Sequence, residues 1–363
     1  MKLFHVFVVM LALPMAAQAF AQSEGDLKVK VKGFVDSYHA VRTEGDRDWM
    51  ASRTRARGEL TLGMEAASVY VSMNALYNAV LPERTGLELR EAFISYQKGG
   101  LDVRAGRQIV VWGVADALRV TDLVSPFDYT EFLAQDYDDI RIPVGALRVK
   151  YGWNLVNFDV ICVPVPEFFV LPTEGPWAVP AVLGVGERPA KKLANMEFGG
   201  RMTVNLSALD FSVCALRTWE KMPVEGRYPR QTMVGGDVSL PAGAFVLRGE
   251  AAWYSLGGVK GLAGVDWYAG RDWNVSVQYS HQGSDGMATA RVSKELLRSM
   301  LKLSTFAYVD VTNGGVFNRL SAAYAVSDQV EVTAGYDYFY ADRGLFALYK
   351  RNSEVWGKVK YSF

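Results

Sequence analysis

The amino-acid sequence predicts an all-β protein, an antiparallel transmembrane β-barrel of about 18 strands with a loop folded inward after the fifth strand. Three observations predict this fold class. Segments of about ten residues with alternating apolar and polar side chains follow one another along most of the chain. Charges and glycines interrupt every apolar run after residue 21, so no stretch of ~20 apolar residues could form a spanning helix. The last segment, Ser353–Phe363, alternates in the same way and ends on an aromatic residue.

The first 21 residues are predicted to be a secretory signal peptide. Lys2 precedes an apolar stretch, Leu3–Leu13, which is too short to span a bilayer as a helix. Two overlapping Ala-x-Ala sequences follow, and we favour cleavage after Ala21. Residues 22–363 are then expected to form one barrel domain. An exported chain without a spanning helix satisfies its backbone polar groups in lipid only as a closed barrel.

The strands are predicted from their alternation, taken in order along the chain. Their approximate ranges are 27–41, 52–64, 69–79, 87–97, 101–111, 143–152, 155–163, 196–206, 209–219, 231–240, 244–254, 261–269, 273–282, 286–293, 299–310, 315–326, 330–340 and 353–363. The range 286–293 has the poorest pattern, and residues 293–298 could instead form a helical turn. Because both termini are expected on the periplasmic side, the number of strands must be even. This favours 18 strands, with 16 as the alternative.

Two faces of opposite polarity distinguish these strands. Val69, Val71 and Met73 alternate with Ser72 and Asn74 in one of the clearest examples. A soluble β-sandwich or β-solenoid would show the same alternation. The membrane interpretation is favoured by the signal peptide and by aromatic residues at strand ends, which gather at membrane interfaces; these are Trp153, Trp219, Trp253, Trp267 and Tyr340. Short turns are placed in the periplasm and long loops outside.

The final strand resembles the closing strand of bacterial outer-membrane β-barrels. This resemblance implies an outer-membrane location, with membrane lipid and the barrel-assembly machinery, which would engage the strand ending at Phe363, as partners. The formal net charge of zero argues against nucleic acid as a partner. Cys162 and Cys214 fall on opposite faces of the predicted wall, so no disulfide is expected between them.

Inward positions carry the charges of a predicted water-filled lumen. Arg53, Arg55 and Arg57 occupy three successive inward positions about 7 Å apart and form an arginine ladder. Further inward charges that we assign to the lumen are Arg104, Arg148, Arg248 and Glu250. These charges either brace the wall in pairs, as expected for Arg248 with Glu250, or select solutes, as expected for the ladder. Strict alternation does not allow Arg90 and Glu91 both to face the lumen.

Residues 112–142 interrupt the series of strands with an insertion rich in acidic and aromatic side chains. Its acidic residues are Asp116, Asp122, Asp128, Glu131, Asp136, Asp138 and Asp139. Folding into the lumen would bury the aromatic residues and place the carboxylates opposite the arginine ladder, as in a constricted pore. Calcium binding by residues 136–139 is a rival interpretation, although the spacing matches no EF-hand loop. A second, proline-rich loop at 164–195 is either a lid over the external mouth or an exposed loop.

A family resemblance lies in the same region. The sequence Gly106-Arg107-Gln108, then Trp112-Gly113, two aspartates, Pro126 with Asp128, and Arg141 with Pro143 resembles a motif of a poorly characterised family of outer-membrane barrels, distantly similar to alginate-export porins. That family usually has Asn before the proline, where this chain has Ser125. The resemblance implies passive transport across the outer membrane and an in-folded segment after Trp112.

The predicted function is passive passage of small polar or anionic solutes through a charged, loop-constricted channel. The alternative is a conduit for lipid-like or polymeric cargo in an envelope export system. A barrel hydrolase is a more remote alternative, because Ser280, His281 and Asp285 are adjacent in sequence but adjacency is not triad geometry. The sequence predicts no enzyme, no metal site and no cofactor, and it leaves open the solute, the direction of flow and the oligomeric state.

Overall fold

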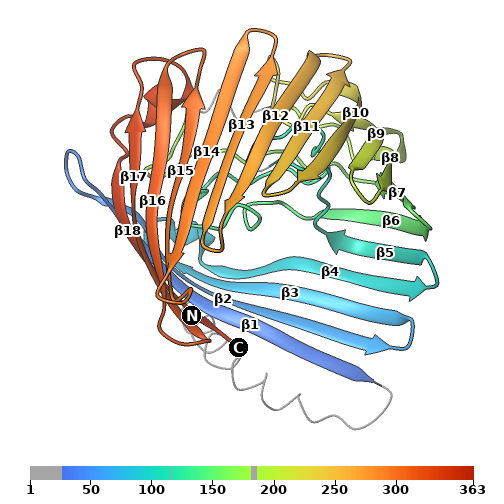
Figure 1. The fold of residues 1–363 in the computed structure, drawn as a ribbon, viewed down its shortest axis with the longest axis horizontal. Coiled ribbons are helices and arrows are strands. Elements are labelled where there is room, and N and C mark those ends of the chain that lie inside the picture. Colours follow the sequence, from blue (N-terminus) through green and yellow to red (C-terminus); the bar gives the residue numbers. More distant parts are fainter. Residues whose placement is uncertain (1–26, 116, 181–185) are drawn as a thin grey trace.

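The computed structural model describes residues 27–115, 117–180 and 186–363. Within them, 18 antiparallel strands close into one barrel, because β1 pairs with both β2 and β18 and every other strand pairs with its neighbours in sequence (Figure 1). The strands are β1 Lys28–Arg42, β2 Trp49–Met64, β3 Ala67–Asn78, β4 Gly86–Lys98, β5 Leu101–Gln108, β6 Val144–Trp153, β7 Val156–Val163, β8 Glu197–Asn205, β9 Asp210–Trp219, β10 Arg230–Ala242, β11 Phe245–Tyr254, β12 Gly258–Ala269, β13 Trp273–Gln282, β14 Asp285–Leu296, β15 Leu301–Asp310, β16 Gly315–Ala325, β17 Val330–Tyr340 and β18 Glu354–Ser362. Short 3-10 helices occur at Pro82–Arg84, Leu193–Asn195 and Leu345–Tyr349.

The prediction of 18 strands is confirmed, including the weakest strand. β14 pairs with β13 from Asp285 to Lys294 and with β15 from Met287 to Leu296. The helical turn considered for residues 293–298 does not form, because the strand runs on to Leu296. Leu297, Arg298 and Ser299 then take positive φ angles of 53°, 58° and 67° in the turn to β15. The predicted signal peptide and its cleavage site lie outside the described residues. No helix in the described part of the chain is long and apolar enough to cross a membrane.

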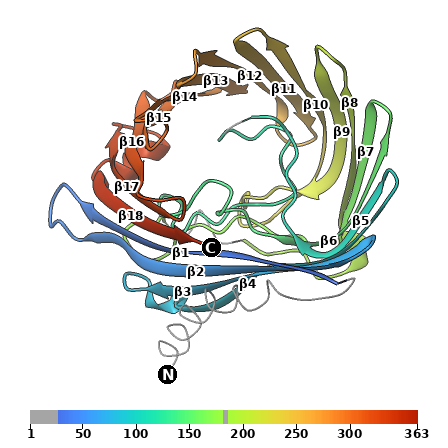
Figure 2. The ribbon, with the colours of Figure 1, turned by 60° about the horizontal axis from the view of Figure 1, so that its bottom comes forward.

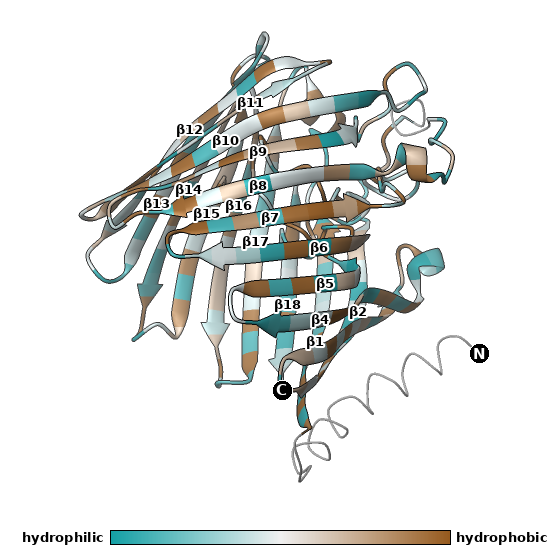
Figure 3. Ribbon diagram, turned by 90° about the vertical axis from the view of Figure 1, so that its right-hand side faces the viewer, coloured by the Kyte–Doolittle hydropathy of each residue, from teal (hydrophilic) through white to brown (hydrophobic). Residues whose placement is uncertain are grey.

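The two faces of the wall differ as the alternation predicts. On β3 the outward Val69 and Met73 are exposed, whereas the inward Ser72 and Asn74 are buried. Hydrophobic and hydrophilic residues alternate along many strands in the same way (Figure 3). Cys162 and Cys214 are free thiols. Apolar side chains on the outer face would contact lipid, and polar ones would face the interior.

A β-bulge in β4 changes the expected alternation at one place. Ser72 pairs with Glu91 and Met73 with Leu89, so Arg90 has no partner in β3. The Arg90 guanidinium donates to the carbonyls of Asp138 and Asp139 inside the barrel. Glu91 Oε1 accepts a hydrogen bond from the Ile109 amide. The prediction that only one of Arg90 and Glu91 faces inward is therefore wrong, because a bulge inserts one extra residue and re-aims the side chains beside it.

The barrel is closed by the two terminal strands. Gly33 N donates to Phe363 O at 2.9 Å, and Phe363 N donates to Gly33 O at 3.0 Å. A Cβ atom at Gly33 would come within 2.5 Å of both the Arg57 carbonyl and the Phe363 ring, so only glycine fits under that ring. The last aromatic residue is therefore built into the seam of the barrel.

Candidate functional site

The chain between β5 and β6 crosses the inside of the barrel. Figure 2 shows this segment, coloured teal to green, within the ring of strands. On one side Trp112, Val120 and Val124 pack in a buried apolar cluster with side chains of β6, β7 and β9 to β12. On the other side Leu133 and Ala134 join a second buried cluster with side chains of β1, β2 and β16 to β18. The inserted segment is thus attached to opposite walls, as an in-folded loop requires.

Glu250 on β11 holds the first part of the inserted segment. Its carboxylate accepts hydrogen bonds from the amides of Val114, Ala115 and Thr121 and from the Thr121 hydroxyl. Arg248, two residues earlier, donates to the Val114 carbonyl at 2.8 Å and pairs with Asp266 at 2.6 Å. The expected pair between Arg248 and Glu250 is therefore wrong. Each of them binds the inserted segment instead, and Asp266 on the neighbouring strand neutralises the arginine.

The arginine ladder on β2 lies beneath the second part of the inserted segment. Arg53, Arg55 and Arg57 are only 2%, 2% and 6% exposed. Asp139 accepts from Arg55 at 2.9 Å and from Arg57 at 2.6 Å. Arg55 also pairs at 2.6 Å with Asp36, directly opposite it on β1. The inserted carboxylates therefore neutralise much of the ladder, as the predicted apposition of acidic loop and basic wall requires.

The remaining contact of the ladder is weaker. Arg53 reaches Glu131 only at 3.5 Å, and among the described residues no acceptor lies within hydrogen-bond distance of Arg53 Nε. Glu131 is instead held by Asn78, whose amide donates to it at 2.8 Å. Arg53 is thus the least neutralised member of the ladder, although it is fully buried.

The electrostatics of Asp139 and Asp136 follow from these contacts. Burial alone would raise the pKa of Asp139, but the guanidiniums of Arg55 and Arg57 outweigh burial and hold that pKa well below its ordinary value. Burial likewise opposes ionisation of Asp136, and Lys358, 3.1 Å away, lowers the pKa of Asp136 below its ordinary value. Both carboxylates are therefore charged at neutral pH and attract the basic wall.

A cavity of about 180 Å³ remains between the ladder and the inserted segment. Six arginines and four carboxylates line it: Arg53, Arg55, Arg84, Arg90, Arg107 and Arg141 with Glu88, Asp128, Glu131 and Asp139. Arg107 donates to the Arg90 carbonyl at 3.2 Å, and in the described chain no carboxylate lies within ion-pair distance of it. The cavity could hold roughly six water molecules at their liquid volume, which is room for a small anion.

The other predicted charges are mostly paired within the wall or the inserted segment. Their contacts are Arg104 with Asp102 (3.2 Å), Arg148 with Asp159, Asp122 with Arg141 (2.6 Å), Asp128 with Arg84 (2.7 Å) and Asp138 with Arg141 (3.2 Å). Asp116 lies outside the described residues. Sequence reasoning did not assign Asp36 or Arg84 to the site, and it named Arg107 only as part of the family-like motif, because nothing local in the sequence marks a side chain as a partner of a distant loop.

Several positions of the family-like motif have a structural reason. Gly106 has a φ of 135°, and a Cβ atom there would lie 2.3 Å from the Ala92 carbonyl oxygen. Arg107 then lines the cavity, and the buried Gln108 amide donates to the Ala146 carbonyl. Ser125, where the family usually has Asn, accepts a hydrogen bond from the Val110 amide at 3.0 Å. The motif therefore builds the entry of the inserted segment.

The proline-rich segment 164–195 packs on the inserted segment. Val170 N donates to Phe127 O at 3.0 Å, and Tyr129 N donates to Val170 O at 2.8 Å. Phe168 and Trp177 are buried. These contacts favour the prediction of a lid over that of an exposed loop, for the described part of the segment; residues 181–185 lie outside it.

The residues considered for hydrolysis do not assemble a triad. His281 Nδ1 lies 3.2 Å from the Tyr279 hydroxyl, and Ser284 is hydrogen-bonded to Asp285. Among the described residues there is no group of three or more His, Cys, Asp or Glu that could hold a metal ion. The calcium interpretation of residues 136–139 therefore gains no support, since Asp139 is engaged by arginines.

Comparison with known proteins places the fold among porins. Residues 78–160 match a family described as a protein of unknown function, DUF1302. No curated protein matches the chain. OccK11 of Pseudomonas aeruginosa aligns with a TM-score of 0.59 at 8% identity, covering 92% of this chain and 96% of its own. OccAB3 of Acinetobacter baumannii aligns with a TM-score of 0.54 at 9% identity, covering 93% and 99%.

An engineered variant of the Rhodopseudomonas blastica porin is also similar, with a TM-score of 0.49 at 11% identity, covering 93% of this chain and 100% of its own. The alignments with OccK11 and OccAB3 show that the fold of this protein is that of a porin-like barrel. The DUF1302 match covers less than half of the chain and includes the motif region. These matches do not test the likeness to alginate-export porins, which stays a prediction.

Proposed function

We propose that this protein is an outer-membrane porin that passes small anionic solutes through a lumen narrowed by the inserted segment. The observation that carries the proposal is the cavity between ladder and inserted segment, which has two more guanidiniums than carboxylates in its lining. Arg107 and Arg53 Nε are the donors there that the protein itself leaves least satisfied. A carboxylate, phosphate or sulfonate group is the kind of ligand that either arginine would bind.

The arrangement of charges supports passage as well as binding. Arginines of the wall and carboxylates of the inserted segment face one another across the cavity, so a solute entering it meets a field across its path. An anion would be attracted to the arginines of the wall, whereas a cation would be repelled by the excess of guanidiniums in the cavity. Passage also needs weak binding, and the carboxylates compete with the solute for the same arginines.

Ion selectivity in planar bilayers tests the proposal. Replacing all three ladder arginines would also release Asp139, so single variants are more informative. Arg107→Gln removes a cavity cation that holds no carboxylate, and it should lower the anion-to-cation permeability ratio. Arg104→Gln is the matched control, because Arg104 lies on the same strand, pairs with Asp102 and does not line the cavity. Equal reversal potentials for wild type and Arg107→Gln would contradict an anion pathway at this cavity.

The proposed location and topology follow the porin-like fold. The mature chain would sit in the bacterial outer membrane with its signal peptide removed, its short turns in the periplasm and its terminal strand recognised by the barrel-assembly machinery. The alternative function, a conduit for lipid-like or polymeric cargo, is favoured by one observation: two segments pack inside the barrel through buried apolar clusters. Reconstituted protein with no conductance would favour that alternative.

A further inference from the structure

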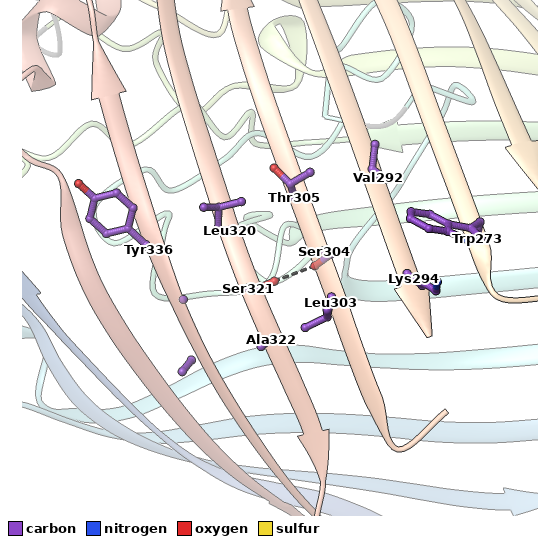
Figure 4. A pocket seen from close by; sticks show the side chains of 12 residues that line it. Trp273, Val292, Lys294, Leu303, Ser304, Thr305, Leu320, Ser321, Ala322 and Tyr336 are labelled. Carbon is purple, nitrogen blue, oxygen red and sulfur yellow. Dashed lines mark hydrogen bonds between the residues drawn. The ribbon is translucent and has the colours of Figure 1, made fainter. Parts of the chain in front are cut away.

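The outer face of the barrel has a groove of about 620 Å³ across β13 to β17, lined by none of the residues that line the cavity described above (Figure 4). Leu303, Leu320 and Tyr336 flank it; Leu320 pairs with Tyr336, and Leu303 with Ala322. Ala322 in turn pairs with Ala334, so two methyl groups lie side by side where neighbouring rows carry larger side chains. The groove is thus a gap in the apolar layer that would face lipid.

One end of the groove carries a positive charge. Lys294 is the one Lys, Arg, Asp or Glu in the groove lining, and its Nζ lies 4.6 Å from the centre of the Trp273 ring. Trp273 begins β13 and Lys294 is near the end of β14, so both lie at the short-turn end of the wall, where β18 also ends. A tryptophan at a strand end is typical of the membrane interface, and a lysine there can reach the headgroup layer.

We infer that this groove binds one acyl chain of an anionic phospholipid whose phosphate is held by Lys294. The mostly apolar lining of the groove suits a hydrocarbon chain, and the ammonium lies at the end where a headgroup would be. Basic side chains at membrane interfaces attract anionic lipid in this way. The ligand chemistry is therefore a phosphodiester with hydrocarbon chains, at the periplasmic leaflet.

A second copy of the chain fits the groove less well. In the described part of the chain no carboxylate lies within ion-pair distance of Lys294. The side chains beside it on the outer face are Trp273 and Leu303. A partner of the same chain placed over this apolar surface would bury the ammonium without a counter-charge, which is strongly unfavourable. A lipid phosphate supplies that counter-charge and leaves the ammonium hydrated.

Native mass spectrometry of the full mature protein tests the inference. The detergent-purified protein is titrated with phosphatidylglycerol and, separately, with phosphatidylcholine of the same acyl chains. One phosphatidylglycerol should bind about fivefold more tightly than phosphatidylcholine, the effect expected of one basic side chain near an anionic surface. Lys294→Gln should abolish that preference. Lys302→Gln is the control for the loss of a lysine at the same end of the wall, because Lys302 pairs with Glu295, alternates to the inner face and does not line the groove.

A second variant separates the groove from the charge. Ala322→Leu combined with Ala334→Leu fills the gap with side chains that the outer face carries elsewhere, so folding should persist. This variant should lose bound lipid of both kinds. The inference is overturned by equal affinity for the two lipids in wild type, by unchanged lipid binding in the filled variant, or by a dimer of the chain that disappears on filling.

Discussion

Replacing Asp139 by Asn is the sharpest perturbation of the inserted segment. Asp139 contacts Arg57 at 2.6 Å, Arg55 at 2.9 Å and Arg90 at 3.4 Å, so one carboxylate joins the segment to two strands of the wall. Asparagine keeps nearly the same volume and one acceptor oxygen but removes the charge. Three guanidiniums would then face a neutral side chain in a place with little access to water.

The size of the effect follows from burial and from the partners that remain. Removing one member of a buried ion pair costs about 3–5 kcal/mol. The lower end applies here because Arg55 keeps Asp36 at 2.6 Å and because asparagine still accepts one hydrogen bond. A loss of about 3 kcal/mol would shift the docking equilibrium of this part of the segment by roughly a hundredfold.

Hydrogen exchange of the purified protein in detergent measures that shift. Amides near residue 139 should exchange roughly a hundredfold faster in Asp139→Asn, whereas amides of the barrel strands should not change. Asp138→Asn is the control, since the Asp138 side chain is 85% exposed and touches only Arg141. If the two variants exchange alike, the ion pairs with the ladder do not hold the segment, and the reasoning from burial and charge is wrong.

Three further predictions follow from the same contacts. Glu250→Gln should speed exchange at residues 113–121 by about tenfold, because one hydrogen-bonding charge lost from a buried site costs about 1–3 kcal/mol, while residues near Asp139 stay protected. Because the pKa of Asp139 is held below its ordinary value, its ion pairs stabilise docking fully above about pH 4 and lose strength as the pH falls further; conductance should therefore rise as the pH falls below about pH 4, with a smaller rise in Asp139→Asn. Deleting Ala115–Asp139 should enlarge single-channel conductance, and an unchanged value would mean that this segment does not limit the current.

The strands were predictable because their signal is local. A period of two along ten residues states which side chains share a face, and turn residues mark where each strand ends. β14 has the poorest alternation, but it was still predicted, because a barrel with both termini on one side needs an even number of strands. The prediction failed at a place in β4 where the alternation of inward and outward side chains changes. The bulge at Arg90 depends on how β3 and β4 align, and that alignment is not written in either strand alone.

The site was predictable in part, for a related reason. Parity placed Arg53, Arg55 and Arg57 on the inner face, and composition indicated that the acidic insertion would face them. Neither parity nor composition could predict the ion pair between Asp139 and Arg57, which are 82 residues apart. Nor could they predict that Arg248 pairs with Asp266 and not with Glu250. Such pairings depend on the path of the chain across the lumen, and many paths are compatible with one composition.

These pairings change where selectivity should reside. A bare ladder would present three full charges to a solute, but two of its arginines are already paired with Asp36 and Asp139. The main role of the ladder in the structure is therefore to bind the inserted segment. The cations left for a solute are those that the segment neutralises least, above all Arg107 and Arg53, whose Nε has no hydrogen-bond partner among the described residues. Selectivity should accordingly follow Arg107 more closely than Arg57, and a variant series at these two positions in one bilayer assay would show which arginine the solute meets.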